Sequence, residues 1–331
     1  MSVFKYFQVV FSNFLHGFHF LGKIDLEQKS ADFDKEIFSL KASNAQLEFE
    51  INQLRKALID LYYEVNKDEA GKYSHELSFL HSQRDITMFP YEKETHRSSP
   101  IYTEFDQQKG LPFVFHKNKR LYFPKEWSID KVEETYRYFM ETECLTAVDK
   151  GFKRPHQYQS GPFKIEEGDV LLDVGCAEGL VALDAIEIVK KVILFESDSI
   201  WEAPLKATFE PYKEKVEIIN KLVGDKDDNA TTTLSSFSRT LGEEETFFVK
   251  MDIEGAEEKV VKGNADFFKK KKIKVACCTY HRDEHFSNLS TIFENWGYSV
   301  TPSDGYILCF LDGVFKPPFF RKGLIRASNI K

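Results

Sequence analysis

Residues 170–180, Val-Leu-Leu-Asp-Val-Gly-Cys-Ala-Glu-Gly-Leu, determine the fold that we expect for this chain. A short apolar run ends there in a glycine-rich turn, and helical spacing follows over 180–189. A second apolar run, 191–195, ends at Glu196. This order is typical of a strand, a tight turn, a helix and a second strand in a parallel sheet buried on both faces. Glycines let the backbone approach a ligand, and the helix presents free N–H groups there.

The acid at the head of this turn indicates which cofactor the turn binds. The turn reads D-x-G-x-A-x-G over 173–179, whereas a dinucleotide site reads G-x-G-x-x-G. An anion at this position disfavours a pyrophosphate and favours a cationic cofactor with an amino-acid tail. Asp173 therefore favours S-adenosylmethionine over NAD. Glu196 lies 17 residues after Gly179, close to the spacing at which an acid accepts both ribose hydroxyls.

Further apolar runs extend the sheet. Strands are expected at 216–223, 247–253 and 273–280, a helix at about 287–296, and a hairpin from 298–300 and 306–310 around Asp304-Gly305. The alternation predicts an α/β fold with a doubly wound, Rossmann-like sheet, mostly parallel with an antiparallel last strand. Ligands bind at the carboxyl ends of such strands, and these ends are Gly175, Glu196, Asp252 and His281.

These motifs together resemble the FkbM family of class I S-adenosylmethionine-dependent methyltransferases. The resemblance covers about 160–312 and is most specific in Lys-Met-Asp-Ile-Glu-Gly-Ala-Glu over 250–257. It implies methyl transfer to a hydroxyl, often of a sugar or natural product. It also implies cofactor contacts at Asp173, Gly175, Gly179 and Glu196, and we expect Cys176 and Ala177 of the same turn to join them. Ala177 replaces the middle glycine of the general turn, and Ser235 stands where the family usually has Asp.

Removing the proton of a hydroxyl requires a general base. His281 is the first candidate because a histidine titrates near neutral pH, and Asp252 is the second. Asp252 and Glu254 lack a third ligand for a divalent cation, so no metal is expected. Residues 281–285 match the H-x-x-E-H metalloprotease pattern, but their first His ends an apolar strand rather than lying on a helix.

Residues 25–68 carry a heptad repeat. The d positions are Leu26, Phe33, Leu40, Leu47, Leu54 and Leu61, and the a positions are Ser30, Ile37, Asn44, Ile51, Leu58 and Val65. Such a seam predicts a parallel coiled-coil homodimer through 26–65, in which Asn44 meets its own copy and fixes the register. Each g residue then faces an e residue of the partner, as in Lys29–Asp34, Glu36–Lys41 and Glu50–Arg55. The alternative is a long helix packed within one chain, because Phe38, Phe49, Ile59 and Tyr63 lie off the seam.

Residues 1–24 predict an amphipathic, aromatic-rich helix. Its stripe is Phe4, Phe7, Phe11, Phe14, Phe18 and Leu21. Two interpretations stay open, a peripheral membrane contact through 1–21 and a helix docked on protein. No uncharged apolar run reaches the ~18 residues needed to cross a bilayer. We expect a cytoplasmic protein, with contact at the inner face of the membrane as the alternative.

The composition sets further limits. The chain has 331 residues and a net charge of −8, which disfavours nucleic acid as a partner. Its five cysteines match no zinc spacing and indicate reduced, buried thiols. The mixed region 69–160 contains a hairpin with a basic tip at 111–123, a helix at 129–147 and a substrate-side loop at 150–161. The methyltransferase domain is expected at 161–315, and a basic tail at 316–331.

The function that these features predict is O-methyl transfer from S-adenosylmethionine to a small-molecule or glycan acceptor, in polysaccharide biosynthesis. The acceptor would be a saccharide or a glycolipid precursor. Two alternatives stay open. The first is a coiled-coil scaffold with an S-adenosylmethionine-binding module, against which the intact turn and ribose acid count. The second is an N-methyltransferase.

Overall fold

A computed structural model describes residues 23–92, 101–143, 153–238, 242, 244–310 and 315–330. The chain divides into two units, Met1–Leu61 and Tyr62–Lys331, which we call the arm and the main unit. The helix predicted for 1–24 lies almost wholly outside the described residues. Within the described residues, no helix is both long and apolar enough to span a membrane.

The described part of the arm belongs to one long helix. Helix α2 runs from Lys23 to Val65, which confirms a helix across the heptad repeat. A single chain does not test whether this helix pairs with another, so the coiled coil stays a prediction. Two short helices follow it in the main unit, α3 (Lys67–Lys72) and α4 (Ser74–Ser82).

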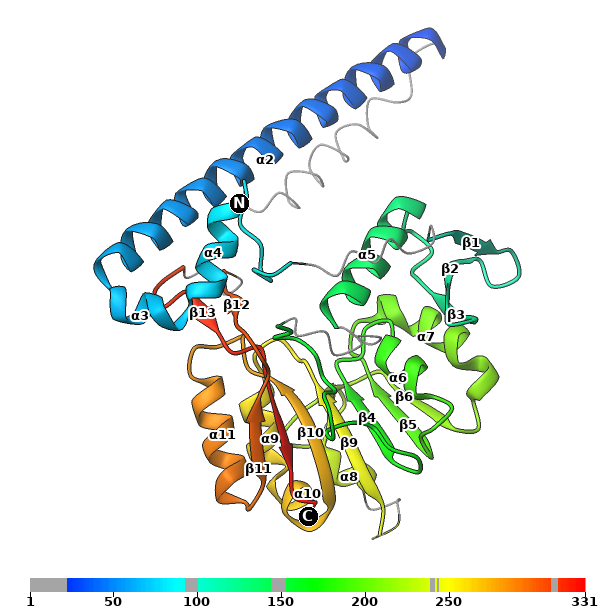
Figure 1. The fold of residues 1–331 in the computed structure, drawn as a ribbon. Coiled ribbons are helices and arrows are strands. Elements are labelled where there is room, and N and C mark those ends of the chain that lie inside the picture. Colours follow the sequence, from blue (N-terminus) through cyan, green and yellow to red (C-terminus); the bar gives the residue numbers. More distant parts are fainter. Residues whose placement is uncertain are drawn as a thin grey trace. The chain divides into compact units, whose positions relative to one another are not determined.

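A seven-stranded sheet in the order β11-β14-β10-β9-β4-β5-β6 forms the centre of the main unit (Figure 1). Its strands are β4 (Val170–Val174), β5 (Lys191–Phe195), β6 (Val216–Ile219), β9 (Thr246–Met251), β10 (Lys272–Cys278), β11 (Ser299–Pro302) and β14 (Leu324–Ser328). The five strands from β10 to β6 are parallel, and β14 runs antiparallel to both of its neighbours. The doubly wound, mostly parallel sheet is therefore confirmed.

Both faces of the sheet are covered by helices, as the uninterrupted apolar strands require. Along β4, Leu171 faces one hydrophobic cluster while Val170 and Leu172 face the other. Helices α6 (Leu180–Ala185) and α7 (Glu202–Phe209) cover the first face, and Figure 1 shows both on one side of the sheet. The second face is covered by α8 (Leu234–Ser238), α9 (Glu257–Gly263), α10 (Ala265–Lys270) and α11 (His285–Asn295).

The antiparallel part of the sheet differs from the predicted hairpin. β11 pairs with β14, which lies within 316–331, the segment expected to be a basic tail. Ile307–Leu308 (β12) instead pairs with Phe320–Arg321 (β13) in a separate two-stranded sheet. The prediction failed because the segment is not solvated throughout. Arg326 is buried, and its guanidinium donates to the carbonyl oxygens of Gln157 and Tyr158.

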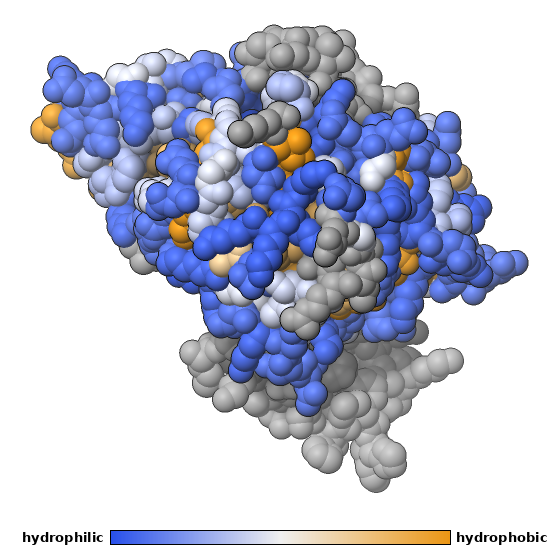
Figure 2. Space-filling view, turned by 90° about the horizontal axis from the view of Figure 1, so that it is seen from below, coloured by the Kyte–Doolittle hydropathy of each residue, from blue (hydrophilic) through white to orange (hydrophobic). Residues whose placement is uncertain are grey.

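The region before the sheet follows the sequence pattern. The predicted hairpin forms from β2 (Leu111–His116) and β3 (Lys119–Tyr122), with β1 (Thr103–Asp106) beside β2. Helix α5 (Ile129–Thr142) begins where expected, because the side chain of Ser128 accepts a hydrogen bond from the Lys131 amide. The remaining short elements are η1 (Ser199–Trp201), η2 (Glu210–Tyr212), β7 (Leu222–Val223) and β8 (Thr231–Thr232). The face seen in Figure 2 is mostly hydrophilic, with apolar residues in small separate patches.

Candidate active site

A cavity of about 600 Å³ opens at the carboxyl ends of β4, β5 and β9. The turn after β4 and the acid after β5 form one wall, with Gly175, Cys176, Ala177, Glu178 and Glu196. A second wall brings together residues from distant parts of the chain: Met88, Phe89, Tyr138, His156, Asp252 and Tyr280. The cavity thus joins a cofactor-type turn to a cluster of titratable side chains.

Position 175 accepts only glycine, because the turn lies very close to the end of β9. Its φ is 75°, and a Cβ atom there would lie 2.0 Å from the carbonyl oxygen of Asp252. Gly179, also predicted as a cofactor contact, lies outside the lining. A Cβ at Gly179 would lie 2.8 Å from the Phe209 ring, so this glycine serves helix packing.

Glu196 connects the two strand ends that meet at the cavity. Its Oε2 accepts a hydrogen bond of 2.9 Å from the Ala177 amide, and its Oε1 accepts one of 2.8 Å from the Asp198 amide. The carboxylate is therefore fixed in orientation at the rim of the turn. Carboxylate oxygens have further lone pairs, so the same group can accept the two hydroxyls of a ribose.

Asp173 lies behind the cavity rather than in its lining. It is paired with Lys250 across β4 and β9, and Lys250 Nζ lies 3.2 Å from Asp173 Oδ1. Both side chains are buried. Burial raises the pKa of Asp173, and the Lys250 charge partly offsets that rise. Lys250 also donates a hydrogen bond to the Gly175 carbonyl oxygen, so this ion pair stabilises the turn.

The cavity has buried carboxyl groups that a cationic ligand would ionise. The buried Glu178 lines it, and burial raises the pKa of this carboxyl to about 7. Glu143 also lines it, and its buried Oε2 has no hydrogen-bond partner among the described residues. Burial raises the pKa of Glu143 as well. A bound ammonium or sulfonium would stabilise both carboxylates, so these residues fit S-adenosylmethionine.

Asp252 is the centre of the titratable cluster. Its Oδ2 lies 3.3 Å from His156 Nε2 and accepts a hydrogen bond of 3.1 Å from the Tyr158 hydroxyl. Its Oδ1 lies 3.4 Å from the Tyr280 hydroxyl and 3.5 Å from His281 Nε2. Burial opposes ionisation, but the His156 hydrogen bond and the charges of His156, Lys250 and His281 lower the pKa of Asp252 well below its usual value. Asp252 is therefore an anion that orients its neighbours.

His156 is the histidine that lines the cavity, from the 150–161 loop that the sequence marked only as a substrate-side candidate. It is 7% exposed, and its Nδ1 has no hydrogen-bond partner among the described residues. With Nε2 held by Asp252, a neutral His156 has its lone pair on Nδ1. That atom is the acceptor a general base needs.

His281 is close to this cluster but outside the lining of the cavity. Its Nδ1 lies 2.9 Å from Glu257 Oε1, and its Nε2 lies 3.4 Å from Glu254 Oε2. Burial favours the neutral ring, but the Glu257 hydrogen bond and the charges of Asp252, Glu257 and Glu254 outweigh it and raise the pKa of His281. A histidine that keeps its proton is a poor base, and it neutralises the charge of the neighbouring carboxylates.

We expect the His281→Gln variant to lose about 1–3 kcal/mol of stability, because Glu257 is fully buried and loses a charged donor. A raised pKa stabilises the fold fully below the unfolded value of 6.5 and less as pH rises through the folded value. The difference in unfolding free energy between wild type and variant should therefore be largest below about pH 6.5 and shrink at alkaline pH. Urea titrations across this pH range measure that difference. A difference that grows with pH would contradict the assignment of His281 as a protonated partner of Glu257.

Two groups of side chains in the described region have atoms close enough to hold a metal ion. They are His156–Asp252–Cys278 and Asp252–Glu257–His281. In the first group, the Cys278 Sγ lies 3.5 Å from His156 Nε2. Contacts of 2.9–3.5 Å join the histidines and carboxylates of both groups. The expectation of no metal stays a prediction.

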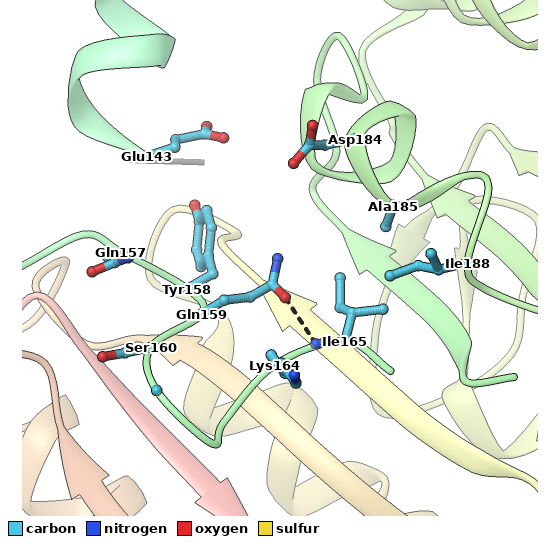
Figure 3. A pocket seen from close by; sticks show the side chains of 11 residues that line it. Glu143, Gln157, Tyr158, Gln159, Ser160, Lys164, Ile165, Asp184, Ala185 and Ile188 are labelled. Atoms are coloured by element: carbon cyan, nitrogen blue, oxygen red, sulfur yellow. Dashed lines mark hydrogen bonds between the residues drawn. The ribbon is translucent and has the colours of Figure 1, made fainter. Parts of the chain in front are cut away.

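A second cavity, of about 310 Å³, shares Glu143 with the first. Figure 3 shows Glu143 at the upper left and Asp184 at the upper right of it, with the Tyr158 ring and the Gln159 side chain below them. Gln157, Ser160 and Lys164 complete its polar lining. Tyr158 also reaches Asp252 through its hydroxyl, so this side chain connects the second cavity to the titratable cluster.

Comparisons with known proteins agree with this arrangement. Residues 191–300 match the family model described as the methyltransferase FkbM domain. A search of curated proteins finds no match. Among solved structures, the methyltransferase FkbM from Methylobacillus flagellatus KT is 19% identical, with a TM-score of 0.41, over 51% of this chain and 46% of that one. This chain therefore spans less than half of that neighbour's length.

Two other solved structures also match part of this chain. A precorrin-6y C5,15-methyltransferase from Geobacter metallireducens GS-15 is 12% identical, with a TM-score of 0.34, over 50% of this chain and 84% of that one. A protein from Streptococcus mutans in complex with SAH is 8% identical, with a TM-score of 0.33, over 50% of this chain and 90% of that one.

Proposed function

We propose that this protein, whose residues 191–300 match the S-adenosylmethionine-dependent methyltransferase FkbM domain, methylates a hydroxyl group. The observation that carries the proposal is the pair of His156 and Asp252, which lines the same cavity as the glycine turn. The acceptor that we propose is a saccharide or a glycolipid precursor.

The residues of the first wall would hold the cofactor. Glu196 accepts the ribose hydroxyls, the turn at Gly175–Ala177 lies against the cofactor, and Glu143 and Glu178 face its positive charges. When bound, S-adenosylmethionine supplies a methyl group on a sulfonium. Because the leaving group is neutral, the protein mainly positions the acceptor and excludes water.

The residues of the second wall would activate the acceptor. A hydroxyl is too weak an acid to lose its proton unaided at neutral pH, so a base in contact with it is required. Nδ1 of His156 accepts that proton. Asp252 accepts a hydrogen bond from the Nε2–H group and stabilises the imidazolium that forms. Burial raises the pKa of the Tyr158 phenol, so Tyr158 stays protonated and keeps Asp252 in place.

The second cavity supports a polyhydroxylated acceptor. Its lining combines amide, hydroxyl, amine and carboxyl groups around the Tyr158 ring. Directed polar groups beside an aromatic face suit a ligand with many hydroxyls better than an apolar one. An acceptor larger than one sugar unit could extend into this cavity past Glu143.

Transfer of a labelled methyl group tests the proposal against its alternatives. Incubation of the full chain with methyl-labelled S-adenosylmethionine and a panel of neutral saccharides and amino sugars should place the label in an alkali-stable ether. EDTA should leave the rate unchanged, because His156 and Asp252 supply the base without a metal. Label on nitrogen would show an N-methyltransferase, and cofactor binding without transfer to any acceptor would favour a binding module.

A further inference from the structure

Helix α2 exposes a continuous apolar seam. Every apolar a and d position from 47 to 65 is exposed, from 44% to 78%: Leu47, Ile51, Leu54, Leu58, Leu61 and Val65. Asn44, at the preceding a position, is exposed as well. Single exposed apolar side chains are ordinary, but a row in one heptad register along a helix marks an interaction surface.

The seam is not the face that α2 buries. Tyr63, which lies off the seam in the main unit, is 5% exposed. Its ring contacts Tyr73 and Phe319 of the same unit. This residue, one of those that suggested a helix packed within one chain, therefore accounts for a different face. The heptad face still lacks a partner in the described structure.

We propose that a second copy of this chain covers the seam as a parallel, in-register coiled coil. The charges beside the seam fit this occupant. In a parallel pair, Lys29 faces Asp34 of the other copy, Glu36 faces Lys41, and Glu50 faces Arg55. Each of these pairs is attractive, so the chain is complementary to itself in this register.

Asn44 selects the orientation. In a parallel, in-register pair the two Asn44 side chains meet and can hydrogen-bond to each other within the seam. In an antiparallel pair an a position faces a d position, and Asn44 would face an apolar residue such as Leu47 without a partner. A buried amide left unpaired costs about 1–3 kcal/mol, which favours the parallel dimer.

Light scattering on the full chain tests the dimer. Wild type should have a mass of about twice 38.5 kDa, and the double variant Leu47→Glu/Leu54→Glu should have about 38.5 kDa. Ala45→Glu is the matched control, because Ala45 is exposed at a b position and should keep the dimer mass. Circular dichroism shows whether each variant is folded. A monomeric wild type, or a dimer unchanged in the double variant, overturns the proposal.

Disulfide formation tests the orientation. The cysteines of the described region, Cys176, Cys277, Cys278 and Cys309, are buried, so in a Cys144→Ser background an added cysteine on α2 reports on the helix itself. Under mild oxidation, Leu54→Cys should cross-link to its own copy, and Ala45→Cys should not. A dimer in which Leu54→Cys fails to cross-link would contradict the parallel register. Wild type that purifies with a different chain on the seam would overturn self-pairing.

Discussion

Replacing His156 by glutamine should lower kcat by about 10²–10⁴ while leaving the affinity for S-adenosylmethionine nearly unchanged. The side chain lines the acceptor wall of the cavity, and its free Nδ1 is the atom that would take the acceptor proton. Glutamine is similar in size and can still donate to Asp252, but its amide is not basic.

Two further variants make this expectation specific. Asp252→Asn should also lower kcat strongly, because the amide no longer stabilises the imidazolium. His281→Gln should retain most of the turnover at a pH where it is folded, because His281 is outside the lining and held by Glu257. Single-turnover kinetics measures the rate of methyl transfer in each of the three variants. Normal turnover in His156→Gln together with an inactive His281→Gln would restore the sequence-based choice of His281 as the base.

Replacing Asp173 by alanine should destabilise the fold by about 3–5 kcal/mol, a large share of the stability of a typical domain. The reason is Lys250, which is 4% exposed and would be left as a buried charge without its main partner. Burial opposes the charge of Lys250, but Asp173, Asp252 and Glu143 outweigh it and raise the pKa of that amine. The variant removes Asp173, the largest of these stabilising charges, so burial of the Lys250 amine becomes costly and the variant unfolds more easily.

The double variant Asp173→Ala/Lys250→Met is the control for this pair. Because it removes both charges, it should recover much of the lost stability. Urea denaturation of the wild type, the two single variants and the double variant gives the coupling energy. Additive losses would show that the two groups act independently. The same geometry means that Asp173→Ala is a poor probe of cofactor binding, since loss of the fold would mask loss of the site.

The fold was predictable where the strands are apolar throughout. The expected strands at 170–174 and 191–195 have the observed bounds, because a buried parallel strand carries its own signal. The expected strand at 216–223 is interrupted after Ile219, where polar Asn220 and Lys221 separate β6 from β7. β14 was missed because charge was taken to mean exposure. Arg326 is buried by pairing with backbone carbonyls, which local sequence does not show.

The site was predictable on the cofactor side and only in part on the acceptor side. Gly175, Cys176, Ala177 and Glu196 line the cavity because they belong to one local strand–turn–strand unit. His156 comes from a segment before the sheet, and its contact with Asp252 depends on how that segment packs. No local pattern marks this contact. The only signal was the position of a polar loop, with a histidine, just before the first strand.

A calorimetric titration of S-adenosylmethionine into wild type and Glu196→Gln tests the proposed cofactor site most directly. Wild type should bind one molecule per chain, because one cavity combines the turn with Glu196. Glu196→Gln should bind at least about tenfold more weakly, since a charged acceptor of hydrogen bonds is worth ~1.5–3 kcal/mol. Glu202→Gln, which changes an exposed acid of α7, is the control and should bind like wild type. No binding by wild type, or equal binding by Glu196→Gln, would contradict the assignment of this cavity.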